Sequence, residues 1–186
     1  MSIAERLDEP VLAELHSYWS GQCRGRLTPA RRDIDPVDIP HLLPHIALTE
    51  IVDRGAGQQP RIRYRLAGTQ IEQHFGCALT NRFLDELLEG PFIEYITGLY
   101  ARLMNEVAPL YSESKFGAGS SVALQAKRLM LPLSDDQTAV TMVLSGVIFK
   151  DSSPNDRETV LQAHGRFQPS VSIGKFRSDI QPETEA

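Results

Sequence analysis

The sequence predicts an α+β domain in which one five-stranded antiparallel sheet carries helices on one face. Two strand-like segments come first, a run of short helical segments follows, and three further strand-like segments come last. Strands that are grouped rather than alternating with single helices indicate an antiparallel sheet with segregated helices. The expected strands lie at 46–53, 61–67, 109–117, 122–133 and 138–149.

The N-terminal part of the chain predicts a flanking helix over 8–23, with Asp8 as its cap. Its apolar residues fall along one stripe, which needs a partner surface. That surface is either the sheet of the same domain or the same helix of a second subunit. Since the stripe is large for an isolated flank, we expect a homodimer. The residues expected at the dimer or partner surface of this helix are Leu15, Tyr18 and Trp19.

The first two strands are predicted to form a hairpin after a proline-rich connector over 24–45, where Asp35 and Pro36 begin one turn of helix. In the second strand, RIRYRLA, apolar and arginine residues alternate. The arginines Arg61, Arg63 and Arg65 therefore share one face of the sheet.

The segment YRLAGTQIEQHFG at 64–76 predicts a strand that passes into a short helix. Thr69 and Glu72 have the spacing of a capping box, and Gly76 is placed to end the helix. A longer helix is expected over 92–106. The last strand is apolar on both faces, which is typical of a central strand covered on both sides.

Domain organisation follows from these elements. We expect a helix and connector at 1–45, a core at 46–150 and a polar extension at 151–186 whose end is disordered. The net charge of −5 argues against nonspecific nucleic-acid binding. The sequence has no apolar run long enough to span a membrane and no signal core, so we expect a cytoplasmic protein with two unpaired cysteines.

Several motifs in register resemble one known family. They are Tyr18-Trp19, RRDIDPVDIPHLLPHIAL (31–48), RYRLAGTQIEQHFG (63–76), LTNRFLDEL (79–87) and LMLPLSDD (129–136). With this order of elements, the chain resembles the single-domain PAS proteins of alphaproteobacteria, long catalogued as a domain of unknown function (the PAS_5 family). The resemblance implies a PAS fold and a sensory or protein-interaction role in signal transduction, with an unidentified signalling protein as partner and no catalysis.

The resemblance also implies where a ligand would bind, since PAS cavities lie between the inner face of the sheet and the helical segment. Pockets for small ligands are largely apolar with a few polar groups. The alternative is that the same side chains fill a closed core. The candidate ligand-binding residues are Tyr64, Ile71, Phe75, Phe83, Ile96, Tyr100, Leu103, Arg128, Met130 and Met142.

Arg128 alternates with apolar residues, so its strand position can direct it inward. A buried arginine needs a carboxylate, from Glu50 or Asp85, or an anionic ligand. If the faces align, the arginines of the second strand and Lys127-Arg128 form a cationic strip for an acidic partner. Arg63 and Arg65 are therefore candidate partner-surface residues, and an anion-binding protein or small enzyme using Arg65 and Arg128 is the alternative function.

The sequence is also compared with the motifs of cofactor-binding proteins and enzymes. The helix at 92–106 has no histidine to ligate haem, and His74 is interpreted as an edge residue. The motif TNRFLDEL resembles the light-sensing flavin motif, but Asn81 is followed directly by Arg82, without the reactive cysteine. Known nucleophile, phosphate and dinucleotide motifs are absent from the sequence. We therefore expect no cofactor, no metal and no catalytic residues, with a haem- or flavin-bound sensor as the alternative.

Overall fold

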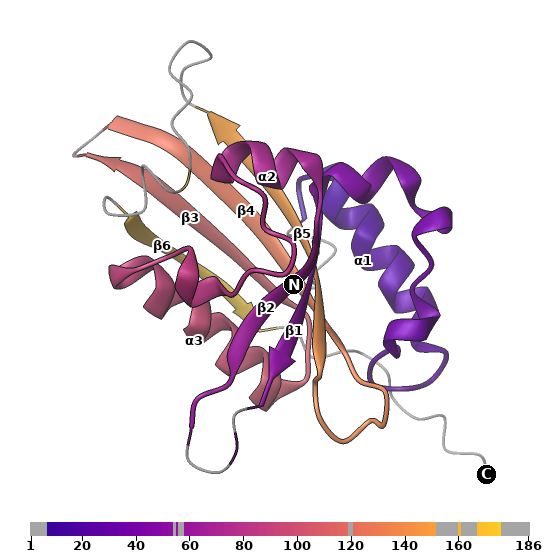
Figure 1. Ribbon diagram of the computed structural model, residues 1–186. Helices are drawn as coiled ribbons and strands as arrows, with labels where there is room; N and C mark the ends of the chain where they lie inside the picture. The colour runs from indigo at the N-terminus through magenta and orange to yellow at the C-terminus, as the bar shows by residue number, and fades with distance from the viewer. Residues whose placement is uncertain are drawn as a thin grey trace.

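The structure is a computed structural model that describes residues 7–53, 55, 58–118, 121–151, 160 and 167–175. Its centre is one antiparallel sheet with the strand order β2-β1-β5-β4-β3-β6 (Figure 1). The five predicted strands are present and β5 lies in the middle, between β1 and β4. The predicted five-stranded antiparallel sheet is confirmed. The strands are β1 (Ile46–Val52), β2 (Arg61–Ala67), β3 (Leu110–Ala118), β4 (Ser121–Leu133), β5 (Met142–Asp151) and β6 (Phe167–Lys175).

A sixth strand, β6, was not predicted. It lies in the segment expected to be a polar extension and pairs antiparallel with β3, so that it forms one edge of the sheet. The polar sequence of this segment did not predict a strand, because a strand at the edge of a sheet does not need the continuous apolar run of a central strand. The predicted disorder at the end of the chain falls on residues 176–186, which lie outside the described residues.

Helices cover both faces of the sheet, as Figure 1 shows. On one face α2, the 3₁₀ helix η4 and α3 pack against the sheet and enclose a core that includes Phe75, Phe92 and Met130. On the other face α1 and the connector pack against Leu129, Leu131 and Leu144. The helices are α1 (Pro10–Cys23), α2 (Thr69–Phe75), η4 (Leu84–Glu86) and α3 (Gly90–Glu106), and the connector holds η1 (Arg31–Asp33), η2 (Pro36–Asp38) and η3 (Pro40–His45).

The N-terminal helix α1 is docked on its own sheet. Leu12 and Leu15 lie over Gly146 of β5, where a Cβ atom would come within 2.8 Å of both leucine side chains. The indole Nε1 of Trp19 donates a hydrogen bond of 3.0 Å to the carbonyl of Pro132. Leu15 and Trp19 are 0% and 5% exposed, so the expected dimer surface on these two residues is wrong. The stripe already has a partner surface within the chain.

Two of the predicted helix caps are also wrong. Asp8 does not cap α1, because its carboxylate binds Lys127 of β4. Thr69 is the first residue of α2 and its N-cap is Gly68, without a side-chain cap. A side chain at Gly68 would lie 2.1 Å from the Leu43 carbonyl oxygen, so the close approach of α2 to the connector requires glycine. The cap predicted at Asp35 is present, since its carboxylate accepts from the Val37 amide at 2.9 Å.

In the part of the chain that the structure describes, every helix falls short of the length and apolarity needed to cross a bilayer. The two cysteines, Cys23 and Cys77, are both free thiols, and burial raises the pKa of the Cys23 thiol to about 11. A thiol with such a pKa stays protonated and behaves as a small apolar side chain.

Candidate functional site

A cavity of about 30 Å³ lies between the sheet and the helices of the α2–α3 face. Most of its walls are apolar, and the polar groups that reach it come from Tyr64, Tyr100, Arg128 and Ser145. Six predicted ligand-binding residues line it, namely Tyr64, Ile71, Phe75, Ile96, Tyr100 and Arg128. The remaining lining residues are Ala47, Leu84, Leu88, Phe92, Ser145, Val147 and Phe149.

The joint between β2 and α2 positions the tyrosine side of the cavity. The backbone of Tyr64 pairs with the loop before η4, through hydrogen bonds to Asn81 and Arg82 of 2.7 and 2.9 Å. This holds the Tyr64 ring edge-on to Phe75, with ring centres 6.4 Å apart. Burial raises the pKa of the Tyr64 hydroxyl, and the nearby charge of Arg128 opposes that rise. The hydroxyl therefore stays neutral and can donate a hydrogen bond.

Tyr100 of α3 is fixed from the opposite side. Its hydroxyl and the Thr49 hydroxyl of β1 form a hydrogen bond of 2.9 Å. Burial raises the pKa of Tyr100 as well, while this hydrogen bond and Arg128 act in the opposite direction. The α3 helix is thus tied to the sheet at the cavity, and one of the two tyrosine hydroxyls is already committed.

Arg128 is the central feature of the site. It is 9% exposed, and its Nη1 atom is buried without a hydrogen-bond partner among the described residues. The two carboxylates expected to pair with it bind other arginines. Glu50 accepts from Arg63 at 2.6 Å, and Asp85 accepts from Arg61 at 2.5 Å. A buried, incompletely bonded guanidinium is costly, and an anion in the cavity would satisfy it.

Two buried hydroxyls share this sheet face with Arg128. Ser112 lies opposite Arg128 in the neighbouring strand and Ser114 lies opposite Ala126. Both side-chain oxygens are buried without hydrogen-bond partners in the described part of the chain. Buried polar groups are normally bonded. The α2–α3 face of the sheet is therefore under-satisfied over several neighbouring positions.

Sequence reasoning missed Ser145, which lines the cavity from β5. The signal was present, since Ser145 is a polar residue in an otherwise apolar central strand. It was also wrong about Met142 and Phe83. Met142 packs on the α1 face, because it has the opposite parity to the cavity residues of β5. Met130 and Leu103 are buried in the core around the cavity but do not line it.

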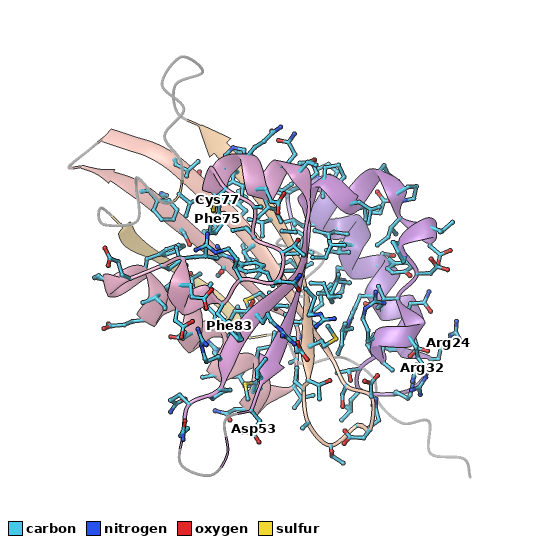
Figure 2. All side chains as sticks on the ribbon, viewed as in Figure 1. Arg24, Arg32, Asp53, Phe75, Cys77 and Phe83 are labelled. Carbon is cyan, nitrogen blue, oxygen red and sulfur yellow. The ribbon has the colours of Figure 1, made fainter. Side chains whose placement is uncertain are left out.

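Phe83 lies outside the cavity, beside β2 and apart from Phe75 (Figure 2). The guanidinium carbon of Arg61 is 3.7 Å from its ring centre. Its backbone forms an isolated bridge with Arg63. Phe83 is therefore a support for the arginine on the outer strand, in a cation–π contact, and the expected ligand role is wrong.

The expected cationic strip does not form. Lys127 and Arg128 point to opposite faces of β4, because neighbouring strand residues alternate. Lys127 binds Asp8 and Glu9 under α1, at 2.5 and 2.9 Å. Arg63 and Arg65 both lie within 4 Å of Glu50, which neutralises part of their charge. The side chain of Arg65 is still 46% exposed, so it can reach a partner.

His74 is half-buried on α2 and lies at the side of the cavity formed by Phe149. Its Nδ1 donates a hydrogen bond of 2.7 Å to the Gln70 carbonyl, and its ring stacks on Phe149 with ring centres 4.4 Å apart. This is the position of an edge residue, as the sequence predicted. Cys77, which follows α2, lies 3.9 Å from a guanidinium nitrogen of Arg82.

Comparison with protein families gives one result. The sequence model described as a PAS domain (PAS_5) matches residues 7–148. Comparison with curated proteins gives no match, and neither does comparison with solved structures. The match covers α1, the connector and the five-stranded core, which are the elements that carried the resemblance in the sequence. The predicted PAS fold is confirmed, and this chain belongs to the PAS domain family.

Proposed function

We propose that this PAS domain is a non-catalytic sensory module that binds a small anionic molecule at Arg128 and reports its presence to a signalling protein. One observation carries the proposal. The guanidinium of Arg128 reaches a largely apolar cavity, and its Nη1 is buried without a partner among the described residues. PAS domains are sensory and regulatory modules, so an unsatisfied charge in the core of one is a natural recognition group.

The energetics favour an anion over a neutral ligand. Leaving a buried donor unsatisfied costs about 1–3 kcal/mol, and more for a charged group. A carboxylate or phosphate oxygen would satisfy Nη1 with a charge-assisted hydrogen bond, which is stronger in a low-dielectric site than in water. A neutral ligand would recover only part of this energy. The described lining residues include no acidic side chain that could compete for Arg128.

The size of the cavity implies a conformational change. A volume of about 30 Å³ is room for roughly two water molecules, at 10–15 Å³ each by this measure. An organic ligand therefore requires the walls to move. The segment from Gly68 to Gly90 supplies Ile71, Phe75, Leu84 and Leu88, and it is built of short elements. We propose that this segment moves outward when the ligand enters.

Lys127, the residue before Arg128 in β4, connects the strand at the cavity to helix α1 on the opposite face of the sheet. Its ammonium group binds the carboxylates of Asp8 and Glu9, which directly precede the first turn of α1. A shift of β4 on ligand binding would change this contact and the position of α1. The proposed signal is therefore a change in α1 or in the 68–90 segment that alters contacts with the partner.

The partner and the oligomer remain proposals. We propose a cytoplasmic signalling protein as partner, with the exposed part of Arg65 on its binding surface. A homodimer is also proposed, on a surface other than Leu15 and Trp19, because those two residues are buried. Light scattering on the purified chain measures its mass, and a monomer at all concentrations would overturn the dimer.

The experiment for ligand binding is mass spectrometry of small molecules released from the purified, unfolded protein. Wild type, Arg128→Met and Arg65→Met should be compared. We expect an acidic compound from wild type and from Arg65→Met, the matched control, and its loss from Arg128→Met. Absence of any released acid from wild type, or an equal amount from Arg128→Met, would overturn the proposal.

A further inference from the structure

The walls of the cavity identify the kind of molecule that would accompany the anionic group. Five of the lining residues carry an aromatic ring, and they surround the cavity from β2, α2, α3 and β5. Tyr64 and Phe75 already meet edge to face, with an angle of 70° between the rings. Rings in this geometry gain stability beyond simple burial, and a further ring in the cavity would extend the arrangement. The aromatic lining residues are Tyr64, Phe75, Phe92, Tyr100 and Phe149.

The charges of the cavity limit the ligand to one anionic group. Arg128 is the cation among the lining residues that the structure describes, and none of those residues is acidic. A planar guanidinium matches a carboxylate better than it matches a single oxygen, because two parallel hydrogen bonds can form. A second negative charge on the ligand would lie in an apolar wall without a partner, at a large desolvation cost.

Neutral polar groups are also available. Ser145 and Tyr64 both line the cavity, and each carries a hydroxyl group. The raised pKa of Tyr64 keeps its hydroxyl protonated, so it can donate to the ligand. The Tyr100 hydroxyl is less available, because Thr49 already binds it. The site therefore accepts one carboxylate and one further neutral acceptor.

The small volume favours a flat molecule. Since the closed cavity holds about 30 Å³, the ligand must separate the walls. Carbon atoms pack at about 3.5–4 Å, so inserting a flat ring requires a gap of one ring thickness. A saturated ring or branched chain is thicker and requires a larger displacement of α2 and α3. Dense protein interiors resist such displacement.

From these observations we infer that the ligand is an aromatic monocarboxylate, with its carboxylate on Arg128 and its ring among the aromatic walls. The inference rests on the proposed function, because it assumes that Arg128 binds an anion. It adds the shape and the single charge of the ligand. Aliphatic acids and phosphate are the alternatives that the experiment separates.

The test is isothermal titration calorimetry on the full chain, refolded after removal of any bound compound. The probes are benzoate, benzamide, which keeps the ring without the charge, cyclohexanecarboxylate, which keeps the charge without the flat ring, and inorganic phosphate. We expect benzoate to bind wild type, with the other three at least about tenfold weaker. A hydrogen bond to a charged group is worth a factor of about ten to a hundred, so Arg128→Met should weaken benzoate by that factor.

Two variants sharpen the result. Arg65→Met removes an arginine from the other face of the sheet and should leave the affinity for benzoate within about twofold, since its charge is outside the cavity. Phe75→Leu keeps an apolar wall but removes an aromatic face. It should weaken benzoate more than cyclohexanecarboxylate and so narrow the ratio between them.

The failures are distinguishable. Equal binding of cyclohexanecarboxylate and benzoate, or tighter binding of phosphate, each dependent on Arg128, would overturn the aromatic inference and leave the proposed function intact. Benzoate binding that is unchanged in Arg128→Met would also overturn the inference. If no probe binds wild type, the inference is overturned, and the released-compound experiment then decides the proposed function independently.

Discussion

Strand β4 carries two buried cations, Lys127 and Arg128, which point to opposite faces of the sheet and differ in their hydrogen-bond partners. Lys127 points under α1, where its ammonium group binds the carboxylates of Asp8 and Glu9 at 2.5 and 2.9 Å. Arg128, the next residue, points into the cavity, and one of its guanidinium nitrogens has no partner in the described part of the chain. The two residues are 7% and 9% exposed, so burial does not separate them. Lys127 therefore has its carboxylate partners within the chain, whereas Nη1 of Arg128 has no partner among the described residues.

A similar difference separates Trp19 from two serines of the cavity face. On the α1 face the indole of Trp19 donates to the Pro132 carbonyl at 3.0 Å. On the cavity face the hydroxyls of Ser112 and Ser114 are buried without partners among the described residues. Unsatisfied polar groups in a native core are often found at functional sites. The bonded groups of the α1 face contribute stability, and the unpartnered groups of the cavity face support the proposal that this face binds a ligand.

The largest expected effect comes from breaking the α1 face. Leu15 is fully buried against the sheet, so Leu15→Ala should lower the free energy of unfolding by about 2–5 kcal/mol. Urea unfolding followed by the fluorescence of Trp19, the single tryptophan, measures this directly. Val37→Ala, at a side chain that is 80% exposed, is the control and should change the value by less than about 0.5 kcal/mol. A similar small effect from both would mean that α1 is not docked as described.

A smaller loss is expected at Lys127. Lys127→Met removes the cation that binds Asp8 and Glu9, and should lower the stability by about 1.5–3 kcal/mol, because hydrogen bonds to charged groups contribute about that amount. The loss stays moderate because Glu9 keeps its contact with Lys150. Hydrogen exchange should become faster in the first turn of α1. Unchanged exchange there would argue against a role for Lys127 in holding the helix.

On the cavity face, removing a polar side chain should raise the stability of the protein instead of lowering it. Ser112→Ala removes a buried hydroxyl that lacks a partner among the described residues, so we expect a gain in stability of about 1 kcal/mol or less. Ser134→Ala is the matched control, because the Ser134 hydroxyl donates to Asp136 at 3.3 Å and its removal should cause a loss. Thermal unfolding of the three proteins measures both signs. A loss in both variants would show that the Ser112 hydroxyl is satisfied.

The smallest expected effect is the dependence of stability on pH in the acidic range. The hydrogen bond from Lys127 lowers the pKa of Asp8 below 3.8, and the one from Lys150 lowers the pKa of Glu9 below 4.5. Groups with a lowered folded pKa contribute stability above their unfolded pKa and lose it as the pH falls through the folded value. Stability should therefore decline below about pH 4.5. The part of this decline due to Asp8 should be smaller in Lys127→Met, and an identical profile would contradict the assignment.

Much of the fold followed from local patterns in the sequence. The alternation in RIRYRLA and the glycine after α2 define β2 and the joint to α2, and both match the structure. The N-terminal caps of α1 and α2 could not be predicted from local sequence, because contacts with distant parts of the chain decide which residue stands at each position. Asp8 binds Lys127 from a distant strand, and Gly68 is required by the approach of Leu43 rather than by the helix.

The site was predictable where strand parity decided it. The apolar neighbours of Arg128 predict that it points inward. They do not predict that Glu50 and Asp85 bind other arginines, which leaves Nη1 of Arg128 without a partner among the described residues. Met142 was assigned to the wrong face because β5 is apolar on both sides, so its sequence does not reveal which parity faces the cavity. The partner of the α1 stripe was left open for the same reason, since an apolar stripe fits a sheet or a second subunit equally well.

Urea unfolding of the ligand-free protein, with Arg128→Met measured beside Lys127→Met, tests directly whether Arg128 lacks a partner within the chain. We expect Arg128→Met to raise the free energy of unfolding by about 1–2 kcal/mol, because it removes a buried donor that has no partner among the described residues. Lys127→Met should lower it. A loss of stability in both variants would contradict the account, since Arg128 would then be satisfied within the chain and would need no ligand.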